Sequence, residues 1–473
     1  MRQLTTLEKW SYALGNVPYA VKDTAFGTFV VFYYTQVLGL SGTLSGLAML
    51  LAMSWDAVSD PMVGSWSDRV HSRWGRRHLL MAVGTVPTAI LFLFLFNPPP
   101  ALSEWQVFAW LLTVSILLRT FLTLYFIPYQ AMGAEMSADY DERTSLATAR
   151  VSVAWLGGLS LPAIAYSLIF VAEGGTDGRL VAENYWHYGV LSTALALVTG
   201  LLCVWGTRTT IPLLPQAPIQ TEPFKLVQPL LDLRGAFDNL NFRRTIGTKL
   251  AFGICAGVYV AMSLYIGTYF WEFTTDQLAG LALPTLFATI TALVVLRRLG
   301  RSWDKPRLIS VICLAFAVNA IWLVGARLLG IAPDNGTLAL YLLQCINLYV
   351  AVFLVIGLQV LGASLLADIL DEQELDTGLR QEGVFFAASA FVLKATTGVG
   401  TFLAGIIIDI SGLSSGAAPG SVAEPVLFTM GLTSAGGTAL MGLVAWRYAL
   451  KVRMSRDKLA RIRTQLDARL VTE

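Results

Sequence analysis

Charge is what this sequence has least of. Asp, Glu, Lys and Arg make up only 14% of its 473 residues, while apolar residues make up 55%. So little polar surface cannot cover a soluble core of this size, which excludes an ordinary water-soluble protein.

Cysteine and histidine are also scarce, and both are scattered. The four cysteines stand singly in apolar segments, without the spacing of a disulfide framework or a metal site. The three histidines are dispersed as well, so no nucleophile paired with a histidine is indicated. The sequence therefore predicts no enzyme, no metal centre, no cofactor and no nucleic-acid partner, and it indicates no obligate protein partner.

Long apolar runs are abundant. Each is about 20 residues long, enough to cross a hydrocarbon layer roughly 30 Å thick as a helix. The sequence predicts twelve such spans, near 11–38, 44–66, 79–96, 105–128, 146–170, 185–206, 245–271, 279–296, 308–328, 338–366, 383–409 and 425–447. We therefore expect an all-α integral membrane protein whose surroundings are the lipid bilayer.

The longest interruption divides these spans six and six. Residues 207–241 hold five prolines and several charges. Extended to residue 244, this stretch is the expected cytoplasmic linker between an N-terminal six-helix half, 1–206, and a C-terminal six-helix half, 245–448, before a basic tail, 449–473. Duplicated six-helix units are a common plan for secondary transporters, with the solute site near the midplane between the halves.

Lys and Arg gather in alternate loops. The loop 67–78, the linker and the loop 297–307 each carry several basic residues, whereas 97–104, 273–278 and 410–424 carry none. Basic loops stay on the cytoplasmic side. We therefore expect a multi-pass protein of a bacterial inner (plasma) membrane with both termini cytoplasmic.

A few ionisable side chains lie at bilayer depth, where each costs roughly 2.5–3.5 kcal/mol and needs a partner or a water-filled cavity. Asp56 and Asp60, four residues apart, share one face of the second helix. Two carboxylates this close resist both being ionised, so they favour a shared proton or a bound cation. Ser59, and Thr123 if the fourth helix packs against the second, would add oxygen ligands. In the alternative interpretation only Asp56 lies deep, and Asp60 orients the helix end before Pro61.

Basic residues at bilayer depth are candidates for solute binding. Lys22 and Asp23 are sequence neighbours, so we expect their side chains to point roughly 100° apart and not to neutralise each other simply. Lys394, well inside the eleventh span, offers a positive charge from the second half to Asp23, Asp56 or Asp60.

Three further residues, in the fourth span or directly after it, have open roles. Arg119 either lines the cavity or bonds a backbone carbonyl. Phe126 and Tyr129 either stack on the apolar face of a sugar or simply pack.

Five stretches form one pattern: 55–64 (WDAVSDPMVG), 67–77 (SDRVHSRWGRR), 32–40 (FYYTQVLGL), 127–146 and 378–394. This pattern resembles the glycoside-pentoside-hexuronide:cation symporters, melibiose permease-like carriers of the major facilitator superfamily. It runs from the first span to the eleventh. The resemblance implies the major facilitator fold, with twelve transmembrane helices in two six-helix halves, and cation-coupled symport of a small-molecule solute, a sugar or glycoside.

The resemblance also implies two groups of site residues. The cation site comprises Asp56, Asp60 and Thr123, and the sugar-binding residues comprise Lys22, Asp23, Arg150 and Lys394. Two positions depart from melibiose permease. Phe126 stands where that permease has an aspartate that helps hold a galactoside, which argues against galactoside specificity. Ser59 stands where it has an asparagine, so Na⁺ and H⁺ both stay open as the coupling ion.

The expected mechanism is alternating access. Charges of the cytoplasmic loops should latch the outward-facing state, and they are Asp68, Arg69, Arg76, Glu142 and Arg143. A distant branch of the same fold, similar to the lysophospholipid symporters of animals, keeps the paired acids. A cation-coupled carrier of a lysolipid or other organic solute, and a non-transporting membrane sensor, are therefore the alternatives.

Overall fold

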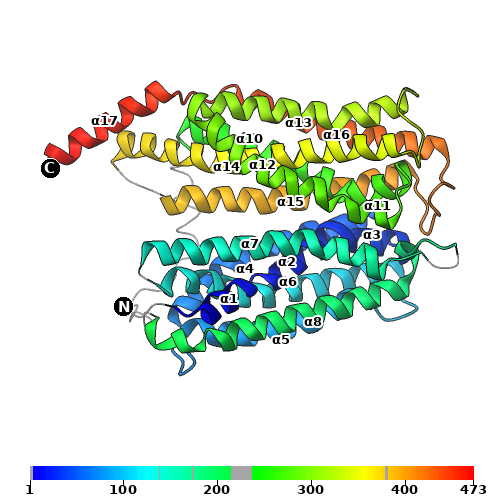
Figure 1. Cartoon of the computed structure of the whole chain (residues 1–473), viewed down its shortest axis with the longest axis horizontal. Coiled ribbons are helices and arrows are strands. Elements are labelled where there is room, and N and C mark those ends of the chain that lie inside the picture. The colour runs from blue at the N-terminus through cyan, green and yellow to red at the C-terminus, as the bar shows by residue number, and fades with distance from the viewer. Residues whose placement is uncertain (1–3, 138, 173–174, 215–236, 379–381, 473) are drawn as a thin grey trace.

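The long apolar runs fold into helices that lie side by side (Figure 1). The computed structural model describes residues 4–472, apart from 138, 173–174, 215–236 and 379–381. Within these residues every regular element is a helix.

The N-terminal half contains six helical rods. The first is divided into α1 (Thr6–Leu14), α2 (Val17–Thr24), η1 (Ala25–Phe29), α3 (Val30–Phe32) and η2 (Tyr33–Val37), where η1 and η2 are π-helical turns. The others are α4 (Gly42–Arg69), α5 (Arg76–Leu95), α6 (Glu104–Glu135), α7 (Tyr140–Ile164) continued by η3 (Ala165–Ile169), and α8 (Ala182–Gly206). The short turns η4 (Gly178–Leu180) and η5 (Arg208–Leu213) precede and follow α8.

The C-terminal half contains six more rods and a tail helix. They are α10 (Leu240–Tyr265) continued by η6 (Ile266–Phe270), α11 (Thr275–Gly280) followed by α12 (Ala282–Ser302), α13 (Lys305–Leu328), α14 (Leu338–Thr377), α15 (Glu382–Ser411) and α16 (Glu424–Ala449), with α17 (Arg456–Thr472) as the tail.

Ten of these twelve rods are long and apolar enough to cross a membrane, judged by length and composition in the described residues. The other two are the first rod, which π-helical turns divide into short pieces, and α4, which carries Asp56, Asp60 and Asp68. Both lie among the other rods in Figure 1. The two rods with the weakest membrane signal are therefore the two in which the sequence places most of its deep charges.

Two rods are longer than the sequence predicts. The fourth continues through Pro128 to Glu135, because neighbouring groups in a bundle compensate for the hydrogen bond that a proline removes. The tenth passes its predicted end at 366 and reaches Thr377. Gly378 then ends the helix with φ of +72°, the left-handed conformation that glycine adopts without strain.

The two halves meet at one end of the bundle and diverge towards the other (Figure 1). We call the end where α4 begins and α15 finishes the closed end, and the end that holds both chain termini the terminal end. At the closed end α4 packs along α15, with Gly42 against Gly405. A Cβ on either glycine would collide with the backbone of the other, so glycine is what permits this approach.

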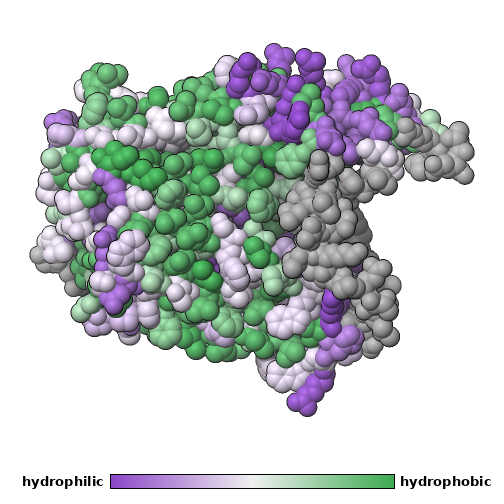
Figure 2. All heavy atoms as spheres, turned by 180° about the vertical axis from the view of Figure 1, so that it is seen from behind, coloured by the Kyte–Doolittle hydropathy of each residue, from purple (hydrophilic) through white to green (hydrophobic). Residues whose placement is uncertain are grey.

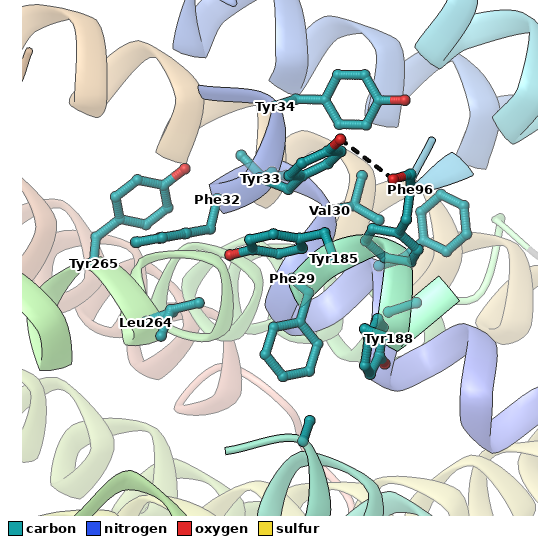
Figure 3. Close-up of a cluster of buried hydrophobic side chains, with 14 of the residues drawn as sticks. Phe29, Val30, Phe32, Tyr33, Tyr34, Phe96, Tyr185, Tyr188, Leu264 and Tyr265 are labelled. Carbon is teal, nitrogen blue, oxygen red and sulfur yellow. Dashed lines mark hydrogen bonds between the residues drawn. The ribbon is translucent and has the colours of Figure 1, made fainter. Parts of the chain in front are cut away.

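Buried aromatic side chains fill the closed end (Figure 3). Tyr33 stacks on Tyr185 with ring centroids 4.4 Å apart, and its hydroxyl donates to the Phe96 carbonyl at 3.3 Å. Phe32 packs against Tyr265 of the other half at 5.1 Å. Aromatic packing therefore spans both halves there.

The outer surface suits a bilayer. Figure 2 shows hydrophobic side chains over the middle of one flank, with hydrophilic side chains gathered towards the two ends. This is the pattern expected of a protein whose flank faces hydrocarbon.

Candidate functional site

A charged cavity of about 310 Å³ lies where four rods converge. It is lined by Tyr19 and Lys22 of α2, Asp56 and Asp60 of α4, Arg119, Leu122, Thr123, Phe126, Ile127 and Gln130 of α6, and Ala390 and Lys394 of α15. Both halves therefore contribute to it. Seven of the lining residues were predicted from the sequence as site residues: Lys22, Asp56, Asp60, Arg119, Thr123, Phe126 and Lys394.

The paired acids of α4 face the cavity from one side of the helix, as their spacing predicts. Asp56 is 9% exposed, and its Oδ2 accepts from Arg119 Nη1 at 2.5 Å. Asp60 lies one turn further on and accepts from Thr123 Oγ1 at 3.0 Å. The expected packing of the fourth rod against the second is thus confirmed.

Lys394 reaches Asp60 from the other half and forms an ion pair with it. The prediction that this lysine faces an acid of the first half is confirmed in its geometry. The sequence alone left three acids open as the partner.

Lys22 and Asp23 contradict the sequence prediction. Lys22 Nζ lies 2.5 Å from Asp23 Oδ1, so the neighbours do neutralise each other. The four-carbon stem of lysine is flexible enough to turn its ammonium back to the next side chain, which a comparison of Cβ directions ignores. Lys22 is 7% exposed and its ammonium also lies 3.8 Å from the centroid of the Tyr19 ring.

Arg119 resolves the open choice in favour of the cavity. It lines the cavity and pairs with a carboxylate, whereas the second possibility was a backbone carbonyl. Its guanidinium also lies over the Phe26 ring, 4.7 Å from the centroid.

Phe126 lines the cavity and stacks on Tyr19 with ring centroids 4.0 Å apart. Tyr129 and Arg150 do not line it. Tyr129 is fully buried and donates to the Tyr12 carbonyl at 2.9 Å, which is a packing role. Arg150 lies beside Tyr12 as well, and so belongs to the same neighbouring cluster.

Oxygen atoms suited to a hard cation gather around the paired acids. They come from Asp56, Asp60, Thr123 and Ser59. Ser59 Oγ and Asp56 Oδ1 are buried and have no hydrogen-bond partner among the described residues. Among all the residues that the structure describes, no cluster of three or more His, Cys, Asp or Glu able to hold a metal occurs.

The proposed latch residues lie at the terminal end, and four of them, Asp68, Arg76, Glu142 and Arg143, have partners within the first half. Asp68 pairs with Arg77 at 2.7 Å, and Arg76 with Glu135 at 2.7 Å. Glu142 pairs with Lys9 at 3.0 Å, and Arg143 donates to the Ser137 carbonyl at 2.5 Å. Arg69 ends α4 beside them. The sequence did not single out Glu135 or Lys9, and it placed Arg77 in a basic loop and motif but not among the latch residues, although charged residues near predicted loops were a usable signal.

At the closed end, two contacts between the halves escaped the sequence reasoning. Arg179 of η4 is 2% exposed and donates to Thr268 Oγ1 at 2.9 Å and to the Phe273 carbonyl at 3.0 Å. Asp409 of α15 accepts from the backbone N–H groups of Gly42 and Thr43 at 2.7 and 2.8 Å, where α4 begins. Arg179 stands as the lone basic residue of an otherwise neutral or acidic loop, which is the signal that could have marked it.

A second cavity, of about 270 Å³, has a different chemistry. It lies between the halves, and its lining comes from the first rod and α7 on one side and from rods of the C-terminal half on the other. Charged residues do not occur among the described residues that line it. Two polar lining groups already bond each other, since Tyr259 donates to Asn347 at 3.2 Å. The cavity is therefore predominantly apolar.

Comparisons with known proteins fit this architecture. The family of MFS/sugar transport proteins matches residues 11–451. The inner membrane symporter YicJ of Escherichia coli (strain K12) is 26% identical, over 86% of this chain and 84% of its own. The isoprimeverose transporter of Lactiplantibacillus pentosus is 23% identical over 86% and 80%, and the sodium-dependent lysophosphatidylcholine symporter 1 of Gallus gallus is 24% identical over 87% and 80%.

Among solved structures, the inward open conformation of the xylose transporter XylE from Escherichia coli superposes with a TM-score of 0.58. It is 14% identical and covers 97% of this chain and 98% of its own. The predicted major facilitator fold is thus confirmed, and the proteins that share it are carriers rather than enzymes.

Proposed function

This chain belongs to the MFS/sugar transport protein family, and we propose that it is a cation-coupled symporter of a sugar or glycoside. The observation that carries the proposal is the ion pair between Lys394 and Asp60, which joins the two halves at a pair of acids inside a cavity. A solute and a cation that both disturb this pair would be coupled through it.

In the proposed mechanism the cation binds at Asp60, one of the paired acids of α4, with Thr123 as a further oxygen ligand. The solute occupies the same cavity, where Lys22, paired with Asp23 outside the cavity lining, would hold hydroxyl groups and Phe126 would stack on the apolar face of a sugar ring. A cation at Asp60 displaces Lys394 and frees its ammonium for the solute. Tyr129 and Arg150 act behind the cavity wall.

We infer that the halves, 1–206 and 245–448, rock about this cavity. The terminal end carries the basic loops and would face the cytoplasm of a bacterial inner membrane, with both termini cytoplasmic. In that orientation the structure corresponds to an inward-facing state, since its closed end is sealed by Arg179 and Asp409. A membrane potential would contribute about 2.3 kcal/mol per elementary charge per 100 mV, enough to concentrate an uncharged solute tens-fold.

The test is uptake into proteoliposomes of radiolabelled glycosides, pentoses and uronates, under a sodium gradient, a proton gradient or neither. We expect gradient-dependent accumulation of at least one sugar, which Asp60→Asn abolishes. Asp276→Asn is the matched control, because Asp276 is an exposed acid in the first turn of α11, outside the cavity. No accumulation of any sugar under either gradient would refute the sugar proposal.

A second candidate is a carrier of an amphipathic solute such as a lysolipid. The apolar cavity favours it, because a sugar alone leaves about 270 Å³ of uncharged space between the halves unused. The spans on either side of this space, Asp141–Ile169 and Thr275–Gly300, are also the least buried of the ten, at 17% each. Two spans that face the bilayer on either side of an apolar cavity would admit an alkyl chain between them.

A further inference from the structure

Arg119 gives the charged cavity a cation of its own. Its Nη1 lies 2.5 Å from Asp56 Oδ2, and the two side chains are 3% and 13% exposed. We propose that Arg119 is a tethered cation that takes the place of a metal ion at Asp56. Sodium then does not bind at Asp56, and Asp60 is the carboxylate that exchanges its partner during transport. This inference rests on the proposed function, and it adds that one of the two acids of the same site, Asp56, excludes sodium.

Arg119 carries its charge on a guanidinium group. A guanidinium group keeps its proton throughout the physiological pH range, so it cannot vacate the site by deprotonation as a lysine can. Stacking on the Phe26 ring also holds the guanidinium in place. Separating it from Asp56 would leave two buried charges without a partner, which is strongly unfavourable.

The pair one turn away has the opposite character. The side chains of Lys394 and Asp60 are 34% and 21% exposed, so water and ions reach both. Lysine carries its charge on a flexible stem, which can swing away without rearranging a helix. The two acids of α4 therefore differ: Asp56 is held, and Asp60 is exchangeable.

Within the part of the chain that the structure describes, Arg119 leaves only two oxygen atoms without a partner at Asp56 and Ser59. Asp56 Oδ1 and Ser59 Oγ have no hydrogen-bond partner among the described residues, but hard cations such as Ca²⁺ and Mg²⁺ take about six oxygens. An ion on Asp56 Oδ1 would also stand roughly 5 Å from the guanidinium, where like charges repel.

The charge balance of the cavity agrees with this view. Its charged lining residues are Lys22, Asp56, Asp60, Arg119 and Lys394. Together with Asp23, they form three ion pairs, one on each acid. A metal ion added beside Asp56 would stand next to a guanidinium that keeps its place, whereas a cation at Asp60 takes the place of the Lys394 ammonium, which can swing away.

The test is direct binding of ²²Na⁺ alone to the purified full-length chain in nanodiscs, without any solute. We compare the unchanged chain with Arg119→Gln, which removes the charge, and with Arg119→Lys, which keeps it. Arg119→Gln should bind sodium about a hundred-fold more tightly than the unchanged chain, the effect expected of one unit charge roughly 5–6 Å away. Arg119→Lys should resemble the unchanged chain, and adding Asp56→Asn to Arg119→Gln should abolish the gain.

Three results would overturn the inference. One is tight sodium binding by the unchanged chain that Asp56→Asn removes, which needs no variant of Arg119 to fold. Another is a gain in Arg119→Gln that survives Asp56→Asn. The third is no binding in either chain, because Arg119 would then not be what excludes sodium. The readout needs no sugar, so it is independent of the uptake experiment that tests the proposed function.

Discussion

Lys394 of α15 and Asp60 of α4 form an ion pair that bridges the two halves of the protein within one cavity. Asp60 also accepts a hydrogen bond from Thr123, so three rods meet at a single carboxylate. Any cation or solute that competes for this carboxylate changes the contact between the halves.

Lys394→Gln should abolish concentrative uptake, with a loss of about ten-fold or more, because it removes a unit charge from a cavity of low dielectric. Lys249→Gln is the matched control. Lys249 is another lysine within a rod of the same half, it donates to Ser389, and it does not line the charged cavity. The measurement is uptake into proteoliposomes, and equal losses in the two variants would contradict a specific role for Lys394.

Arg179→Ala should loosen the closed end. The variant loses two charged hydrogen bonds across the halves, each worth about 1.5–3 kcal/mol, so the balance of states should shift at least about ten-fold towards an open seal. Hydrogen exchange of the backbone in η2 measures this opening. Arg327→Ala is the control, since Arg327 bonds Asn335 within its own half. Unchanged hydrogen exchange in Arg179→Ala would show that Arg179 does not hold the closed end together.

Gly405→Ala should push α15 away from α4, because the new Cβ meets the backbone of Gly42. Overpacking of this kind costs about 1–3 kcal/mol and should lower the midpoint of thermal unfolding by several degrees. Gly436→Ala, in α16, is the control, since a Cβ there has no atom within 4 Å and alanine favours a helix. A midpoint that falls equally in both variants would refute the close contact as the cause.

Asp68→Ala should reduce the population of the state in which the terminal end is closed. Asp68 now pairs with Arg77 inside the first half, and the prediction is that these charges engage the second half when the terminal end closes. Accessibility of single cysteines at the two ends, measured with a membrane-impermeant reagent, reports the balance. If Asp68→Ala left that balance unchanged, the prediction that Asp68 belongs to a latch would be wrong.

Gly158→Leu tests the second candidate function. Gly158 lines the apolar cavity, and a Cβ there meets no atom within 4 Å, so leucine should fill the cavity without disturbing the fold. Binding of octyl glycosides should weaken about ten-fold or more, because methylene groups worth about 0.8 kcal/mol each lose their place. Binding of methyl glycosides should not change. Gly436→Leu is the control, and equal weakening of both ligands in Gly158→Leu would refute an alkyl site.

Much of the site was predictable because its signals are local. The spacing of Asp56 and Asp60 places both on one helix face whatever surrounds them, and a lysine deep in a span must find an acid. The prediction for Lys22 and Asp23 was wrong for a local reason too, since it followed Cβ directions and neglected the reach of the lysine stem. Tyr129 was a reasonable candidate by position, but its neighbour Tyr12 buries it.

The sequence by itself determined that this protein lies in a lipid bilayer, that it folds into helical rods and which charged residues lie deep among them. The reason is that insertion into a bilayer is set by apolar runs of about 20 residues. Only the tertiary structure decided which charge meets which. Arg119 and Asp56 are 63 residues apart, and Lys394 and Asp60 are 334 apart, so their pairing depends on how whole rods pack. The contacts of Arg179 and Asp409 with the opposite half exist for the same reason, and they form where the two halves close.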